Sequence, residues 1–260
     1  NRRLAEAALL IYGDYEGDDS PEFVCAVLDS NGGSIEKDVL CFYEGDTLYE
    51  RLPDAEREDY ILAGWYYADG KEVGEKDTID EDITLSARWF KDINLPFVDV
   101  APDSWYYGYV GDLYSEGIVD GMTPDTFEPA GSVTYGQALK LILLSSGVEP
   151  NDTRIAGNHW AQPYMDIAID EGIITEDFCK DLNAAISRKQ IALLASKALG
   201  LTDKSGKSPF VDTDDLNVMA LYNAGIVEGT TESDGLTYYY PDSSITRAEI
   251  TTIIWRIMNY

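Results

Sequence analysis

A motif that occurs three times constrains the fold of this chain more than any other feature. The segment GIVDG at 117–121 recurs as GIITE at 172–176 and as GIVEG at 225–229. Successive copies therefore start 55 and 53 residues apart. Regular spacing of this kind is typical of repeat architectures, in which one unit cannot bury its apolar face without its neighbours. The sequence therefore predicts three units that share one core.

Each copy of the motif lies between two predicted helices. Upstream, apolar residues recur at helical spacing in WYYGYVGDLYSEG, WAQPYMDIAIDEG and LNVMALYNAG, and the last glycine of each is expected to end its helix in a left-handed conformation. Downstream, a capping box starts a second helix, because its two side chains satisfy backbone N–H groups of the first turn. The three boxes are Thr134 with Gln137, Ser187 with Gln190, and Thr246 with Glu249.

The front of the chain, 22–90, has a different pattern. EFVCAVLD and DVLCFYE are short runs of strand-forming residues, joined across SNGG, where Asn31 and Gly32 supply the positive φ angles of a turn. YILAGWYY and ITLSARW add further strands, and GDTLYERL is a candidate short helix. These patterns predict a small, mainly β module. If Cys25 and Cys41 lie on neighbouring strands, they could form a disulfide, but two buried free thiols are the favoured interpretation.

Acidic residues outnumber basic residues by 48 to 19 and are spread along the chain, for a formal net charge of -29. Such a field repels nucleic acid and anionic membranes, so neither is expected as a partner. No apolar run approaches the ~18 residues of a membrane span. The start, 1–21, with NRRLAEAALLIYG, is interpreted as a linker or processing boundary and not as an intact signal peptide.

The residues needed for catalysis are sparse, and no enzyme is predicted. His159 is the only histidine in the chain, so a histidine-activated nucleophile would have to depend on it. The segment that begins at Asp212 resembles a calcium loop but has Asn217 and Asn223 where glycine and an acid are needed. No cofactor or metal site is predicted, although loose calcium binding by surface carboxylates stays open.

Arg247 breaks a local rule. It follows the N-cap residue Thr246, so its cation faces the positive end of the helix dipole, which costs a few tenths to about 1 kcal/mol. Residues that break local rules are candidates for function.

Two family resemblances account for most of the chain. The segment 97–139, with FVDV, a tryptophan, GIVDG, TFEP and VTYGQAL, closely resembles the S-layer homology (SLH) domain, and FVDTDD to SSITRAEI is a second clear match. The resemblance implies an SLH repeat at 97–147, a degenerate one at 153–200 and a third at 209–260. The front module resembles the Listeria-Bacteroides type of bacterial surface repeat. The implied fold class is α+β: a β-grasp-like module, then an all-α, pseudo-threefold unit around a central helical bundle.

The resemblance also implies a function. Grooves between SLH repeats bind secondary cell wall polymer or a peptidoglycan-linked glycan, the polymer often carries a pyruvate ketal, and the arginine of T-R-A-E meets its carboxylate. An exported protein held on the cell wall or in an S-layer follows. The motif residues expected to bind ligand are Arg247, Arg188, Gly229, Gly121, Trp105, Trp160, Asp99 and Asp212. The motif is broken at Tyr135, Glu176 and Thr213, which hold the arginine, glycine and tryptophan positions of different repeats.

Each assignment has a structural alternative. Buried core positions are favoured for Trp105 and Trp160. Arg188 and Arg247 could pair with some of the many carboxylates. Asp99 and Asp212 could cap the helices that follow them. The broken motif positions also favour a second function, a structural or adhesive surface module that self-assembles and has lost its affinity for glycan.

Overall fold

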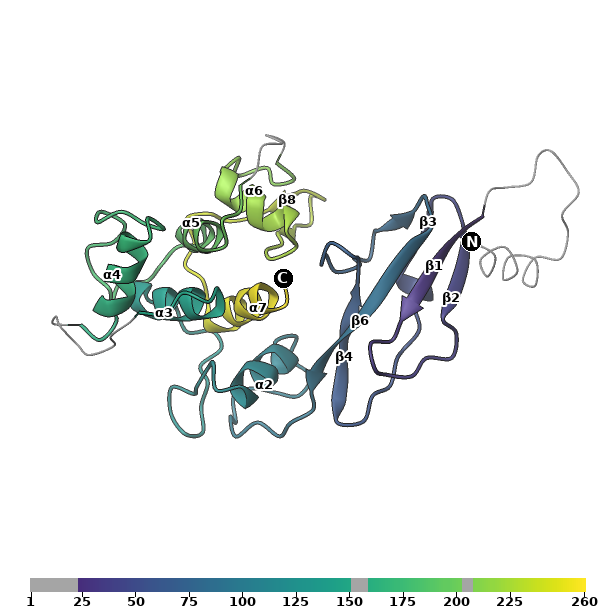
Figure 1. Ribbon diagram of the computed structural model, residues 1–260, viewed down its shortest axis with the longest axis horizontal. Coiled ribbons are helices and arrows are strands. Elements are labelled where there is room, and N and C mark those ends of the chain that lie inside the picture. The colour runs from purple at the N-terminus through teal and green to yellow at the C-terminus, as the bar shows by residue number, and fades with distance from the viewer. Residues whose placement is uncertain (1–22, 151–158, 203–207) are drawn as a thin grey trace, which may run out of the picture. The chain divides into compact units, whose positions relative to one another are not determined.

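The computed structural model describes residues 23–150, 159–202 and 208–260. The predicted linker at 1–21 and the first residues of the second repeat, 153–158, lie outside the described residues. The chain divides into two compact units, with the boundary between Ile93 and Asn94. Each unit is described by itself (Figure 1).

The first unit contains a four-stranded mixed sheet with strand order β2-β1-β6-β4. Its strands are β1 (Phe23–Asp29), β2 (Val39–Tyr43), β4 (Tyr60–Tyr66) and β6 (Ile83–Lys91). The first and last strands, β1 and β6, are parallel at the centre, and β2 and β4 are antiparallel at the edges. The predicted β module is therefore present, while its assignment to the β-grasp-like surface repeat stays a prediction.

Details of this unit correct two expectations. Cys25 and Cys41 are register partners on β1 and β2 and form a disulfide, so the favoured interpretation as free thiols was wrong. The segment GDTLYERL forms the short strand β3 (Asp46–Thr47), which pairs with β5 (Thr78–Ile79), and a single 3-10 turn η1 (Tyr49–Arg51). The predicted turn is present, with φ of 47° at Asn31 and 86° at Gly32. The core beneath the sheet contains Leu28, Phe42, Leu48, Trp65 and Leu85.

The second unit consists of three helix pairs, as the repeats predict. The pairs are α2 (Tyr107–Ser115) with α3 (Tyr135–Ser145), α4 (Gln162–Asp170) with α5 (Arg188–Ala198), and α6 (Leu216–Asn223) with α7 (Arg247–Met258). All three capping boxes form with both of their hydrogen bonds. The glycines after the first helices are left-handed, with φ of 71° at Gly117, 68° at Gly172 and 69° at Gly225. The third repeat adds a hairpin of β7 (Thr230–Thr231) and β8 (Thr237–Tyr238).

The three repeats are joined in a closed cycle. The backbone N–H of Val133 donates to the carbonyl of Ile245, the N–H of Ile245 donates to Ile186, and the N–H of Ile186 donates back to Val133, at 3.1, 3.4 and 3.0 Å. All three side chains are buried. The first helix of each repeat packs on the second helix of the preceding one: α4 on α3, α6 on α5, and α2 on α7. The arrangement is therefore cyclic, while its identity with the family's pseudo-threefold unit stays a prediction.

Candidate functional site

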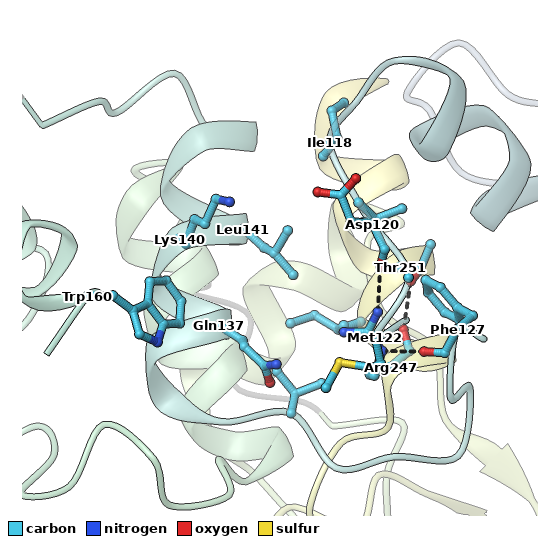
Figure 2. A pocket seen from close by; sticks show the side chains of 14 residues that line it. Ile118, Asp120, Met122, Phe127, Gln137, Lys140, Leu141, Trp160, Arg247 and Thr251 are labelled. Atoms are coloured by element: carbon cyan, nitrogen blue, oxygen red, sulfur yellow. Dashed lines mark hydrogen bonds between the residues drawn. The ribbon is translucent and has the colours of Figure 1, made fainter. Parts of the chain in front are cut away.

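A cleft of about 230 Å³ opens beside the first copy of the repeated motif (Figure 2). All three repeats contribute to it. The loop 118–122 and helix α3 come from the first repeat, Trp160 precedes α4 of the second, and Arg247 begins α7 of the third. We call this cleft groove 1. Its polar and aromatic lining includes Asp120, Phe127, Gln137, Lys140, Trp160, Arg247 and Thr251.

Arg247 is held in groove 1 by backbone carbonyls. Its Nε donates to the carbonyl of Phe127 at 2.7 Å, one Nη donates to the carbonyl of Asp120 at 2.8 Å, and the guanidinium lies over the Phe127 ring. Burial lowers the pKa of Arg247, and the charges of Glu128 and Asp99 only partly oppose this shift, but an arginine remains charged in proteins. No described carboxylate forms an ion pair with Arg247. Its charge is therefore available to an anion that enters the groove.

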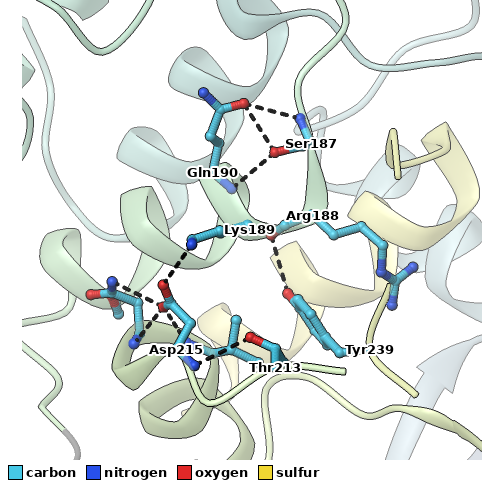
Figure 3. Close-up of polar contacts among 10 residues, drawn as sticks. Ser187, Arg188, Lys189, Gln190, Thr213, Asp215 and Tyr239 are labelled. Atoms are coloured by element: carbon cyan, nitrogen blue, oxygen red, sulfur yellow. Dashed lines mark hydrogen bonds and ion pairs between the residues drawn. The ribbon is translucent and has the colours of Figure 1, made fainter. Parts of the chain in front are cut away.

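Arg188 has the equivalent position in the second repeat but a different environment (Figure 3). One of its Nη atoms lies 2.5 Å from a carboxylate oxygen of Glu249, and its guanidinium lies over the ring of Tyr239. Its side chain is only 17% exposed. The alternative that this arginine pairs with a neighbouring carboxylate is confirmed, so its charge is already satisfied.

The capping residue of the facing helix explains the contrast between the two arginines. The third residue of α7 is Glu249, which caps the helix and also reaches Arg188. The corresponding residue of α3 is the neutral Gln137, which lines groove 1 together with Arg247. Sequence reasoning missed the effect of Glu249 and Gln137 on the neighbouring arginines because it treated both residues only as helix caps. A comparison of the third helical residue among the three capping boxes would have shown that only α7 has a carboxylate there.

Both motif tryptophans are exposed, so the favoured interpretation as core residues was wrong. Trp160 is 43% exposed and lines groove 1, and Trp105 is 61% exposed. An indole ring at the wall of a groove offers a flat apolar surface with a polar N–H, which suits a sugar ring. A role of either ring in binding stays a prediction.

Asp99 and Asp212 organise loops. The carboxylate of Asp99 accepts the N–H groups of Phe127 and Glu128 at 2.8 and 2.7 Å, and Asp212 accepts those of Tyr239 and Tyr240 at 2.9 and 2.7 Å. The helix-cap alternative was wrong, because Tyr106 and Asp215 are the N-caps of α2 and α6. Burial raises the pKa of Asp99, but its backbone hydrogen bonds and the charge of Arg247 together outweigh this effect and lower the pKa overall. Neither carboxylate lines groove 1, so ligand contact by them stays a prediction.

Gly121 and Gly229 are required by close packing. A Cβ at Gly121 would lie 2.5 Å from the Phe97 ring and against the carbonyl of Thr123, and a Cβ at Gly229 would lie 2.5 Å from the Phe210 ring. Gly121 also lines groove 1. The second repeat has Glu176 at this position, and its sequence has no phenylalanine between 148 and 160. The glycine and the phenylalanine thus occur together in two repeats.

The Gly121→Ala variant is expected to lose about 1–3 kcal/mol of unfolding free energy, because the added methyl overpacks the contact with Phe97. Denaturant unfolding of the full chain measures this change. The matched control is Glu176→Ala at the equivalent position, which removes side-chain atoms instead of adding them and is expected to change stability by less than about 0.5 kcal/mol. Equal stability of the Gly121→Ala variant and the original chain would contradict the packing argument.

The three broken motif positions belong to one place in the cycle. Groove 1 combines the loop of one repeat, the arginine of the preceding repeat and the tryptophan of the following one. By the same order, Tyr135, Glu176 and Thr213 would share the groove of the second repeat. The Tyr135 ring packs edge-on against Phe178, and the backbone N–H of Tyr135 donates to the carbonyl of Ala184. The same order assigns Arg188, Gly229 and Trp105 to the third groove.

Two observations bear on other classes of site. Among the described residues, no group of three or more His, Cys, Asp or Glu side chains is placed to hold a metal ion. None of the helices in the described part of the chain is long and apolar enough to cross a membrane.

Residues 96–139 match the family model of the S-layer homology domain. The chain is 25% identical over 185 residues to an endoglucanase of Bacillus sp. (strain KSM-635), which covers 64% of this chain and 19% of that protein. It is 25% identical to the surface-layer 125 kDa protein of Lysinibacillus sphaericus, with coverage of 55% and 13%. It is 30% identical to a surface layer protein of Brevibacillus choshinensis, with coverage of 31% and 7%.

This chain therefore spans less than a fifth of the length of each of these three relatives. The matched region contains α2, the loop of groove 1 and the start of α3. Assignment of the second and third repeats to the same family, and of the front module to a surface repeat, stays a prediction. The chain contains an S-layer homology domain at residues 96–139 and is similar to surface-layer proteins of bacteria.

Proposed function

We propose that this chain attaches an exported bacterial protein non-covalently to the cell wall by binding an acidic glycan of the secondary cell wall polymer in groove 1. The observation that carries the proposal is the partly buried, charged guanidinium of Arg247, which lies in an open cleft without an ion-pair partner among the described residues. The surface-layer relatives and the S-layer homology domain support attachment to the cell wall in general terms. The pyruvylated sugar is the finer part of the proposal.

The chemistry of groove 1 suits recognition of one acidic substituent. Arg247 would hold a carboxylate with charge-assisted hydrogen bonds, and the N-terminus of α7 would add a favourable dipole. Trp160 would stack on the sugar ring. Because the chain carries a net charge of -29, a polyanionic polymer is repelled elsewhere. Binding is therefore local and depends on the fit within the groove.

Two further observations support an exported binding module. Disulfides persist in oxidising surroundings outside the cytosol, and Cys25 and Cys41 form one. His159, the only histidine, is hydrogen-bonded to Asn183 and to the N–H of Ala161. We therefore propose binding without catalysis for this chain.

The test is sedimentation with purified cell wall sacculi, followed by calorimetric titration with a pyruvylated disaccharide. Removal of the acidic polymer from the sacculi is expected to abolish sedimentation. The Arg247→Gln variant is expected to bind the disaccharide roughly 10- to 100-fold more weakly, because it loses charge-assisted hydrogen bonds. Its melting temperature is measured in parallel, since Arg247 also holds two loop carbonyls. The Arg188→Gln variant is the control, with affinity within about twofold.

A second function, self-assembly through these repeats, is favoured by the loss of charge at Tyr135 and by the ion pair that occupies Arg188. Oligomers on light scattering without added polymer, together with no heat on titration with the disaccharide, would support assembly and overturn glycan binding.

A further inference from the structure

Groove 1 contains a second cation that does not belong to the repeated motif. Lys140 is the sixth residue after the cap of α3, and the corresponding residues of α5 and α7 are Leu193 and Thr252. The repeat pattern therefore does not explain the lysine. The packing of α3 does not require it either, because neighbouring positions on the helix supply the buried residues.

Lys140 lies on the α3 wall of groove 1, near Trp160, and Arg247 lies across the cleft (Figure 2). Its side chain is partly buried and makes no hydrogen bond or ion pair with any described residue. Asp120 is the only acidic residue that lines the cleft in the described part of the chain, and it is exposed. An acidic chain thus leaves two cations of one groove without a carboxylate partner.

Two cations that share a partly desolvated cleft repel each other, and this repulsion is relieved when anionic groups bind between or beside them. Arg247 has the shape to hold one carboxylate in a fork. Lys140 is a compact charge on a flexible stem, which suits a second acidic group whose position is less tightly defined. The cleft of about 230 Å³ is smaller than a typical site for a drug-sized ligand, so one sugar with its substituents would fill it.

We infer that Lys140 is a specificity-determining residue and that groove 1 selects a glycan with two acidic groups on the same or adjacent sugars. Arg247 holds the first group, Trp160 stacks on the ring, and Lys140 holds the second group. The second group is a carboxylate or a phosphate. This inference rests on the proposed glycan binding, and it adds that the bound glycan has two acidic groups.

The test compares two ligands by calorimetry: a pyruvylated disaccharide with one acidic group, and the same disaccharide with a uronic acid as its second sugar. The original chain is expected to bind the diacid about fivefold to tenfold more tightly. Lys140→Gln is expected to remove this preference, so that the two ligands bind with similar affinity, while Lys140→Arg keeps the preference. The preference is also expected to shrink as salt is added.

Lys197→Gln is the matched control, because it removes one positive charge from an exposed position on α5. It is expected to keep the preference, which separates a local contact from the net charge of the chain. Equal affinity of the original chain for the two ligands, or an unchanged preference in Lys140→Gln, would overturn the inference. Failure of the original chain to bind either ligand would instead overturn the proposed function.

Discussion

The Gln137→Glu variant is expected to lose glycan binding, and the Glu249→Gln variant is expected to gain a second binding groove. In the existing structure Glu249 forms an ion pair with Arg188, whereas Gln137, the equivalent residue of α3, offers Arg247 no carboxylate. A carboxylate at position 137 would lie in the same cleft as Arg247, at the position equivalent to Glu249, and compete with the carboxylate of the ligand. Loss of one charged contact weakens binding roughly 10- to 100-fold. The reverse change frees Arg188, which the cyclic order of the repeats assigns to the same groove as Gly229 and Trp105.

Both variants should fold, because each residue is the third of a capping box that accepts either side chain. The chain already uses glutamine in the boxes of α3 and α5 and glutamate in that of α7. Calorimetric stoichiometry with the pyruvylated disaccharide measures the outcome. Gln190→Glu in the box of α5 is the control, since its groove contains Tyr135 and not arginine. Undiminished binding by Gln137→Glu would show that Arg247 does not meet the acid.

Removal of the Cys25–Cys41 disulfide is expected to destabilise the first unit by roughly 3 kcal/mol, because the bridge closes a loop with a sequence separation of 16 residues in the unfolded chain. The second unit is expected to keep its stability. Hydrogen exchange of the full chain, with and without reductant, resolves the two units by following the amides of β1 and β2 separately from those of α3 and α7.

The double variant Cys25→Ser with Cys41→Ser should reproduce the effect of the reductant. Cys179→Ser is the control, since Cys179 is a free thiol in the second unit. Unchanged exchange of the β1 and β2 amides after reduction would contradict a stabilising role of the bridge.

Most local signals in the sequence predicted local structure correctly, and the helix expected in GDTLYERL is the exception. The capping boxes depend on residues three apart, and the C-terminal glycines depend on one φ angle, so both can be read from a short segment. The first helices followed from the period of their apolar residues, and the strands followed from short runs of strand-forming residues between turns. These elements were predicted because the interactions that define them lie within one turn or one strand.

Contacts between distant segments could not be read in this way. The pairing of Arg188 with Glu249 joins residues 61 apart in the chain, and the loop contacts of Asp99 join residues 28 and 29 apart. The disulfide was undervalued because residue spacing does not state strand register. The exposure of Trp105 and Trp160 depends on which repeat packs beside which, and a linear motif does not contain that order.

The closed cycle of Val133, Ile186 and Ile245 also sets the number of repeats. Open solenoids can grow or shrink by one unit, because each unit contacts only the next one along the chain. Here the last repeat donates to the second and accepts from the first. A deletion or duplication of one repeat would leave an N–H and a carbonyl at the centre without partners. Three is therefore a fixed stoichiometry, and the unit would be inherited, exchanged between proteins and unfolded as a whole.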